Sequence, residues 1–215
     1  MTAEEAASTR RRYRSPLREQ QASQTRTAII DAATELFHKK GWAGTGMRDV
    51  ARAAGVSIET VYGNFRSKSE LLTACVDLAV VADAEPVPLA QRPAFAALGR
   101  GGRATRIRAA ARLVVGINER AAGVLLAARE AAASDPELAR WRRTAEQRRR
   151  GDVEQAASLI LGRPATREEA DSLWAITAVE MYELLTDLRG WTTRQYERWL
   201  ADVIDRLLPG DGRDR

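Results

Sequence analysis

Residues 45–65 decide the fold of this chain, and they read TGMRDVARAAGVSIETVYGNF. Gly55 divides the stretch into two short segments, 47–54 and 58–65, in which apolar residues recur at helical spacing. Glycine permits the backbone of a tight turn, and Ser57 is a good N-cap for the helix that follows. The pattern therefore predicts a helix-turn-helix, two short helices joined at a sharp angle.

The second of these helices has an outer face that is poor in charge for a solvated helix. Val61 and Phe65 lie four residues apart and give the helix one inward edge. The remaining residues are predicted to face outward: Ile58, Glu59, Thr60, Tyr62, Gly63 and Asn64. An α-helix fits the major groove of DNA, where small polar and aromatic side chains suit phosphates and base edges. This helix is therefore predicted to bind double-stranded DNA.

The flanking residues continue the helical pattern. Apolar residues at three- and four-residue spacing predict a helix over residues 25–40, which Gly41 would end. A capping-box pattern at residues 67–70 predicts that a fourth helix begins shortly after the third one ends. The N-terminal amides of that fourth helix, beside Lys68, would also favour a phosphate group.

Residues 25–76 resemble the DNA-binding domain of the TetR family of transcriptional regulators. The resemblance is carried by several positions in the right order: Thr45-Gly46-Met47-Arg48-Asp49-Val50-Ala51, Ala54-Gly55-Val56-Ser57, Thr60-Val61-Tyr62, Phe65 and Ser67-Lys68-Ser69-Glu70-Leu71-Leu72. It implies that the DNA backbone is held by Thr45, Thr60, Tyr62, Asn64 and Lys68. It implies that bases are approached by Ile58, Glu59 and Gly63, and Ser57 completes the predicted DNA-binding set.

Two positions of the second helix depart from the family pattern. Glu59 stands where a small residue or proline is usual, and a carboxylate near phosphates is costly unless it accepts from a cytosine amino group or pairs with a cation. Gly63 replaces a position that is often bulky, which lowers helix propensity by about 1 kcal/mol relative to alanine. We therefore expect Glu59 to shape the DNA preference and this helix to read fewer bases.

Composition limits the other functions that the chain could have. The net charge of +5 comes largely from arginine, which suits an anionic partner, although a coding bias toward arginine explains it equally well. Cys75 and His38 are the single residues of their types, which excludes a disulfide framework, a cysteine zinc cluster and a histidine-pair metal motif. No phosphate-binding glycine loop or nucleophile elbow is present, and no apolar run could span a bilayer. We expect a cytoplasmic protein that is not an enzyme and has no metal, cofactor or membrane partner.

The pattern along the chain predicts an all-α fold with an N-terminal three-helix helix-turn-helix domain and a larger C-terminal helical domain. Composition divides the chain into a disordered basic arm at 1–23, the helix-turn-helix domain at 24–72, a helical effector-binding and dimerisation domain at 73–208 and a disordered tail at 209–215. Within the third part, prolines and glycines predict a loop at 83–103. The helices expected after it are 104–119, 121–133, 136–161, 166–188 and 192–208. The arm either follows DNA or is a solvated tail.

The C-terminal half offers weaker signals for a pocket and a dimer interface. Polar or aromatic residues within apolar helices are the candidate effector-pocket residues: Asn118, Arg129, Trp141, Trp174, Glu180 and Tyr182. The last two helices provide the candidate dimer residues: Trp174, Tyr182, Leu185, Tyr196, Trp199, Val203 and Leu207. The alternative for both sets is a core within one chain. The arginine run Arg140, Arg142, Arg143, Arg148, Arg149 and Arg150 is expected to form a solvated helix face.

The resemblance implies a transcriptional regulator, by the family's habit a repressor. Such a protein binds a near-palindromic operator as a homodimer and is released by a small-molecule effector. The alternative is a constitutive DNA-binding protein without an effector.

Overall fold

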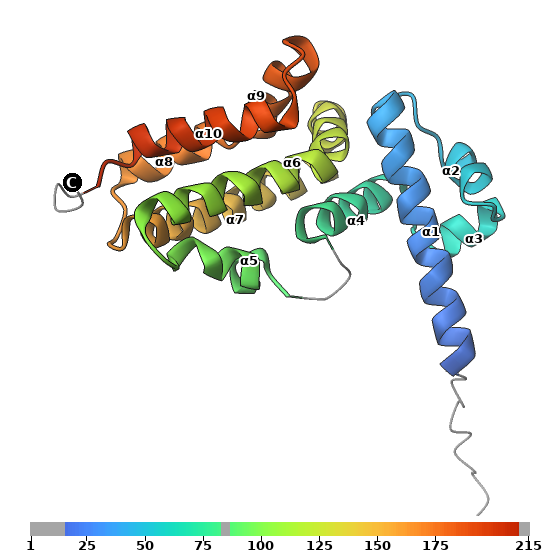
Figure 1. Cartoon of the computed structure of the whole chain (residues 1–215). Coiled ribbons are helices and arrows are strands. Elements are labelled where there is room, and N and C mark those ends of the chain that lie inside the picture. Colours follow the sequence, from blue (N-terminus) through green and yellow to red (C-terminus); the bar gives the residue numbers. More distant parts are fainter. Residues whose placement is uncertain (1–15, 83–86, 211–215) are drawn as a thin grey trace, which may run out of the picture.

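The computed structural model describes residues 16–82 and 87–210, and within these ranges the regular elements are helices, as the sequence predicts (Figure 1). The first four are α1 (Pro16–Lys40), α2 (Met47–Ala53), α3 (Ile58–Asn64) and α4 (Lys68–Val81). Short elements follow: η1 (Leu89–Gln91), α5 (Pro93–Ala96) and η2 (Ala97–Gly99). The remaining elements are α6 (Arg103–Ala132), α7 (Pro136–Leu161), α8 (Arg167–Ile176), α9 (Val179–Glu183), the π-helical turn η3 (Leu184–Leu188) and α10 (Thr193–Leu207).

One hydrophobic core joins α1–α4 to the second half of α6. Its buried residues come from all four N-terminal helices, and α6 and α7 add Ala121, Val124, Ala127, Ala128, Ala131 and Leu138. Burial of such apolar surface is the main favourable contribution to folding. The predicted domain boundary at residue 72 falls inside α4, so the helix-turn-helix shares its core with the following part of the chain.

A second core lies at the other end of α6. It contains Ile107, Ala111 and Val115 of α6 together with residues of α7, α8 and α10, including the fully buried Tyr196 and Leu200. Figure 1 shows α8 and α10 stacked over α6 and α7, with α1–α3 at the opposite side of the molecule. The single helix α6 therefore connects the helix-turn-helix end of the chain with the C-terminal bundle.

The structure corrects the prediction of two helices at 104–119 and 121–133. α6 is continuous through Arg120, although Gly116 and Gly123 weaken the helical preference around it. Val115 before this point is buried in the second core and Ala121 after it is buried in the first, so packing against both cores holds the helix together. Tertiary contacts thus override the local propensity.

The prediction of one continuous helix at 166–188 is also wrong, because the helix ends at Ile176. The Thr177 hydroxyl donates to the carbonyl of Leu173 at 2.8 Å, and Arg149 Nη2 donates to the carbonyl of Trp174 at 2.6 Å. The Trp174 carbonyl is the group that the amide four residues later would use in a continuous helix. Instead, Ala178 N donates to the carbonyl of Ala175, and the chain turns into α9.

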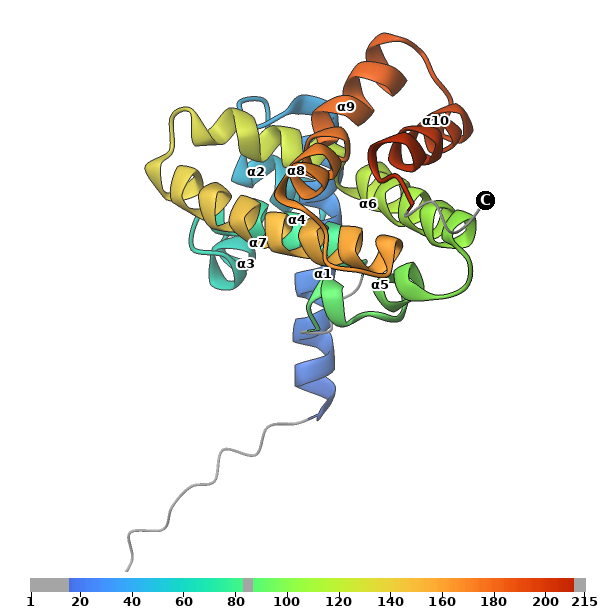
Figure 2. The ribbon, with the colours of Figure 1, turned by 90° about the vertical axis from the view of Figure 1, so that its left-hand side faces the viewer.

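Two predicted irregular segments contain helical structure. α1 begins at Pro16, a residue suited to a first helical turn, so residues 16–23 belong to a helix that projects from the body of the molecule (Figure 1, Figure 2). The rest of the predicted arm, 1–15, lies outside the described residues, as does 211–215 of the predicted tail. In the predicted loop, Phe95 and Leu98 are buried in the second core, which holds α5 and η2 against α6 and α7.

Candidate nucleic-acid interface

The turn between α2 and α3 has the geometry that its sequence predicts. Gly55 has φ +66°, the left-handed conformation that glycine adopts without strain. Val56 N donates to the carbonyl of Ala51 at 3.0 Å, which closes the end of α2. Ser57 caps α3, since its Oγ accepts from Thr60 N at 3.1 Å. These local interactions define the turn between α2 and α3.

The inner face of α3 packs on the first core. Val61 and Phe65 are fully buried, which confirms their predicted inward orientation. Ile58 differs from its prediction as an outward residue, because it is half-buried and packs against the same core. Its position in the first turn, three residues before Val61, places it at the edge of the inner face. Ile58 can therefore offer only part of its side chain to a ligand.

The outer face of α3 is formed by Glu59, Tyr62 and Gly63. All three are exposed, and Tyr62 is the most prominent because 52% of it is accessible. A Cβ at Gly63 would meet no atom within 4 Å, so the glycine leaves open space at this point of the surface. A hydrogen bond from the backbone, followed by one from Ser57, lowers the pKa of the Glu59 carboxyl, which favours its charged form.

Two polar residues of α3 are partly occupied by local hydrogen bonds. Thr60 Oγ1 lies 3.0 Å from Ser57 Oγ, and Asn64 Nδ2 donates to the carbonyl of Thr60 at 2.8 Å. Both side chains are half-buried. They hold the ends of the helix in place, and any contact that they make with DNA would use their remaining polar atoms.

Arg26 of α1 supports the C-terminal end of α3, which sequence reasoning missed. Its Nη1 donates to the carbonyl of Asn64 at 3.0 Å, and its guanidinium lies 4.2 Å from the ring centroid of Phe65. A cation at a helix C-terminus is favoured because the last carbonyls carry partial negative charge. Arg26 precedes Ile29 and Ile30 by about one helical turn, so it lies beside the buried face of α1. This helical spacing is the feature of the sequence that could have indicated its contact with the rest of the domain.

Thr45 is placed differently from its implied role in DNA contact. Its side chain is only 2% exposed, and its hydroxyl donates to the carbonyl of Gly41 at 2.9 Å. A buried hydroxyl that already has a partner cannot reach a phosphate from this position. Thr45 instead stabilises the turn that leads from α1 into α2.

Lys68, at the start of α4, is held by the same turn. Its Nζ donates to the carbonyl of Trp42 and lies 3.9 Å from the centroid of the Trp42 ring. Burial lowers the pKa of the Lys68 ammonium, and the nearby Glu130 carboxylate acts in the opposite direction. The predicted phosphate-binding lysine is therefore anchored to its own chain by one of its three N–H donors, which leaves two for a phosphate.

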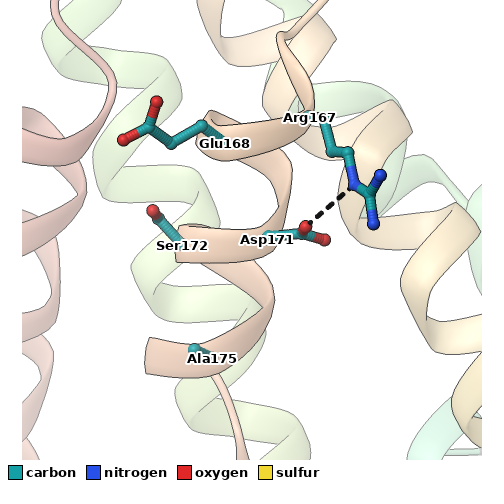
Figure 3. Close-up of a pocket in the computed structure, with 5 residues that line it drawn as sticks. All are labelled: Arg167, Glu168, Asp171, Ser172 and Ala175. Atoms are coloured by element: carbon teal, nitrogen blue, oxygen red, sulfur yellow. Dashed lines mark ion pairs between the residues drawn. The ribbon is translucent and has the colours of Figure 1, made fainter.

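The six predicted effector residues do not line one pocket. A pocket of about 590 Å³ lies on the outer face of α8, where Arg167, Glu168, Asp171, Ser172 and Ala175 form its wall (Figure 3). It is wide open, and none of the predicted residues belongs to it. Trp141 packs against the first core, whereas Arg129 forms an ion pair with Glu180 at 3.0 Å and joins α6 to α9.

A buried polar cluster lies near the remaining predicted residues. Asn118 Nδ2 and Tyr196 Oη are both buried near each other, but neither makes a hydrogen bond of good geometry within the described part of the chain. Burial raises the pKa of Tyr196 to about 12, the neighbouring Asn118 amide lowers it in part, and the Tyr182 ring packs edge-on at 5.1 Å. Buried polar atoms without a well-formed hydrogen bond are uncommon in folded proteins.

Arg149 is the cluster residue that the sequence interpretation misplaced. It was expected on a solvated face, but burial lowers the pKa of its guanidinium and it donates to Thr177 Oγ1 at 3.0 Å. It also lies 5.3 Å from the centroid of the Trp174 ring. The arginine run gives no sign of this contact, because Thr177 is 28 residues away in the chain.

The predicted dimer residues fall into two groups. Tyr196 is fully buried within one chain, so it cannot contact a second copy, and Tyr182 packs on its ring. Leu185 and Trp199 are half-buried against the second core. Val203 and Leu207 are half-buried on α10 but are not among the residues packed against that core, and Trp174 is 36% exposed. Tyr196 therefore belongs to the core of one chain. For Trp174, Val203 and Leu207, a role in a dimer interface stays a prediction.

The fold and the turn geometry define a helix-turn-helix protein with a helical C-terminal bundle. Residues 29–75 match the family model for bacterial regulatory proteins of the tetR family. This part of the chain is therefore similar to the TetR family, as the residues quoted above imply.

The sequence relatives share this domain. The chain is similar to the transcriptional regulators TtgR of Pseudomonas putida, 41% identical over 58 residues, and AcrR of Shigella flexneri, 39% identical over 54 residues. The alignments cover 27% and 25% of this chain and only 28% and 25% of those relatives. Both are named transcriptional regulators.

The solved structures extend the likeness to the whole fold. A TetR-family regulator from Mesorhizobium loti has a TM-score of 0.63 at 21% identity, covering 87% of this chain and 96% of that one. NalD of Pseudomonas aeruginosa, the secondary repressor of a multidrug efflux pump, has a TM-score of 0.61 at 23% identity, covering 89% and 99%. AibR, in complex with isovaleryl coenzyme A and operator DNA, has a TM-score of 0.59 at 18% identity, covering 86% and 99%. Among the described residues, no helix is long and apolar enough to cross a membrane.

Proposed function

We propose that the protein is a cytoplasmic DNA-binding repressor that binds a near-palindromic operator as a homodimer and is released by a small-molecule effector. The observation that carries the proposal is the outer face of α3, where Glu59, Tyr62 and Gly63 are exposed on a helix whose other face is anchored in the core. A helix presented in this way can enter the major groove without exposing apolar core residues. The operator-bound AibR structure has the same fold, which supports this reading.

The distribution of polar groups on α3 and α4 supports separate contacts with the DNA bases and with the DNA backbone. Glu59 and Gly63 would face bases, where a carboxylate can accept from the amino group of cytosine. Tyr62 can donate its hydroxyl to a phosphate. The first turn of α4, with the Ser67 cap and Lys68, lies next along the chain and would meet the DNA backbone.

A homodimer is supported by the residues that α8 and α10 leave on their outer faces. Trp174, Val203 and Leu207 are apolar side chains that the chain's own core does not cover fully. A twofold axis through such an interface would present two copies of α3, and a symmetric pair of half-sites would then fit them.

An effector site is supported by the buried polar cluster of the C-terminal bundle. Asn118 Nδ2 and Tyr196 Oη could hydrogen-bond a ligand, and the Tyr182 ring provides apolar contact area beside them. Effector binding would then shift the population between DNA-binding and released states. A constitutive DNA-binding protein without an effector is the alternative, in which these two atoms bind only water.

Selection of an operator from random DNA by the purified full-length protein tests the proposal. We expect enrichment of a near-palindrome, and a subsequent screen of small molecules should yield compounds that release the protein from this operator. Enrichment of an asymmetric sequence would contradict the homodimer. Release by no compound would favour the constitutive alternative, and failure of the folded protein to enrich any sequence would contradict DNA recognition itself.

A further inference from the structure

The end of α6 holds the turn between α1 and α2 through one carboxylate. Glu130 Oε2 accepts from Trp42 N at 2.9 Å, and Glu130 Oε1 accepts from Ala43 N at 3.2 Å. These two amides follow the end of α1 and have no helical acceptor. Successive amides that converge on one carboxylate form a strong, charge-assisted contact, here between residues that are almost 90 positions apart in the chain.

The turn is shaped to admit this carboxylate. Gly41 has φ +65°, and a Cβ on it would lie 2.8 Å from Glu130 Oε2. Two helical turns earlier on the same face of α6, a Cβ on Gly123 would lie 2.6 Å from the Cα of His38 on α1. α6 therefore meets the DNA-binding end of the chain closely at two successive points, and glycine allows the approach at both.

The same turn holds the lysine that opens α4. Glu130 accepts a hydrogen bond from the Trp42 amide. The carbonyl of the same Trp42 accepts from the Lys68 ammonium, which also lies over the Trp42 ring. Movement of the Trp42 backbone would consequently move Lys68 as well as the start of α2, which begins at Met47.

We propose that Glu130 is a positioning residue for DNA binding, which fixes the Trp42 turn and through it the placement of Lys68 without touching DNA. The inference rests on the proposed function and assigns to it a residue of α6 far from α3 in the sequence. It also gives a direct link between the C-terminal half and the DNA-binding surface in addition to the chain connection through α4.

The sign of the expected effect separates positioning from simple electrostatics. Removal of a negative charge near a DNA-binding surface should strengthen binding, since DNA is a polyanion. Glu130→Gln keeps the size of the side chain but loses the charge and one of the two acceptor atoms. If Glu130 positions the turn, Glu130→Gln weakens operator binding although it makes the protein more positive.

The test compares the full-length wild type with Glu130→Gln and with the control Glu137→Gln. Glu137 is exposed in the first turn of α7, and within residues 16–82 and 87–210 its side chain makes no ion pair or hydrogen bond. For Glu130→Gln we expect about tenfold weaker binding to the selected operator, from the loss of charge-assisted hydrogen bonds. Its plot of log affinity against log salt should be shallower by about 0.9, the value for one lost phosphate contact. Glu137→Gln should bind as tightly as the wild type or slightly more tightly.

Two further readouts exclude a merely structural role. In a double-mutant cycle with Lys68→Ala, the effects of Glu130→Gln and Lys68→Ala on operator affinity should not add. Without DNA, amide hydrogen exchange of Trp42 and Ala43 should be faster in Glu130→Gln than in the wild type, while the global unfolding transition remains cooperative. Additive effects with an unchanged salt slope would overturn the positioning role, as would unchanged exchange at both amides.

The outcome also distinguishes this inference from the proposed function. If the wild type binds the operator and Glu130→Gln binds it equally well, the positioning role fails and the regulator proposal stands. If the wild type binds no DNA, both fail.

Discussion

Gly123 shows how a single residue sets the distance between α6 and α1. A Cβ at this position would lie 2.3 Å from His38 Nδ1 and 2.6 Å from His38 Cα. The ring could rotate away, but the Cα belongs to the backbone of α1, so the two helices would have to separate. The helical preference for alanine and the packing requirement therefore oppose each other at this position.

We predict that Gly123→Ala lowers the free energy of unfolding by about 1–2 kcal/mol, because overpacking costs more than the improved helix propensity returns. The matched control is Gly151→Ala in α7, where a Cβ would meet no atom within 4 Å. Gly151→Ala should raise the free energy of unfolding by up to about 1 kcal/mol. Urea denaturation of both variants measures the difference, and equal stabilisation by both would contradict the close packing at Gly123.

Some residues of the site are positioned by contacts with their sequence neighbours, and others by contacts with residues far away in the chain. Ser57, Gly55 and the inward pair Val61 and Phe65 are placed by local turn chemistry and helical spacing, and the sequence predicts them correctly. Arg26 and Glu130 act on residues 38 and 87 or more positions away, and no local pattern specifies such partners. Their roles become visible only when the packing of α1 and α6 is known.

At the scale of elements, α8 shows how capping fixes a helix start that sequence reasoning placed correctly. Thr166 and Glu169 form a reciprocal capping box, with Thr166 Oγ1 accepting from Glu169 N at 3.2 Å and Glu169 Oε2 accepting from Thr166 N at 2.8 Å. Arg163 adds two hydrogen bonds to the same carboxylate, at 2.8 and 2.9 Å. The side-chain hydrogen bond from Arg163 is the main cause that lowers the pKa of Glu169 from 4.5 to about 2.

The lowered pKa of Glu169 predicts a specific acid sensitivity. Because the folded pKa is below the unfolded value of 4.5, this carboxylate stabilises the folded protein fully above that pH. The contribution should decrease as the pH falls from 4.5 toward 2. Urea denaturation of the wild type and of Glu169→Gln at a series of pH values measures the contribution.

The difference in unfolding free energy between the two proteins should be largest near neutral pH and should shrink in acid. A difference that stays constant down to about pH 3 would show that the ionised Glu169 is not the stabilising species. Asp171 of α8, which pairs with Arg150 of α7 at 2.6 Å, provides a comparison through Asp171→Asn.

The ends of helices are where the element predictions failed. The break after Ile176 arises from Arg149, which takes the Trp174 carbonyl from outside the helix. The continuity of α6 through Arg120 arises from burial on two cores. In both cases the local sequence favours a different helix boundary from the one observed, because contacts with distant segments determine where the helix ends.

At the scale of the whole molecule, α6 is the element that unites the two ends. Its second half completes the core of α1–α4, and its first half packs with α7 and α10. Asp135, the N-cap of α7, also accepts from Ser69 Oγ of α4 at 2.6 Å, so the loop after α6 is attached to the DNA-binding end as well. α6 and the loop after it therefore join the C-terminal bundle to α4 and, through Glu130, to the Trp42 turn.

DNA binding by the outer face of α3 can be tested through the operator affinity of Tyr62→Ala, measured by fluorescence anisotropy. Tyr62 is half-exposed, so its removal should leave the unfolding transition nearly unchanged. The control is Arg112→Ala, which removes an exposed cation of α6 that has no ion pair or side-chain hydrogen bond with any described residue. We predict that Tyr62→Ala weakens binding to the selected operator at least about tenfold, whereas Arg112→Ala changes it less than about twofold. If folded Tyr62→Ala bound the operator as tightly as the wild type, the outer face of α3 would not be the DNA-binding surface.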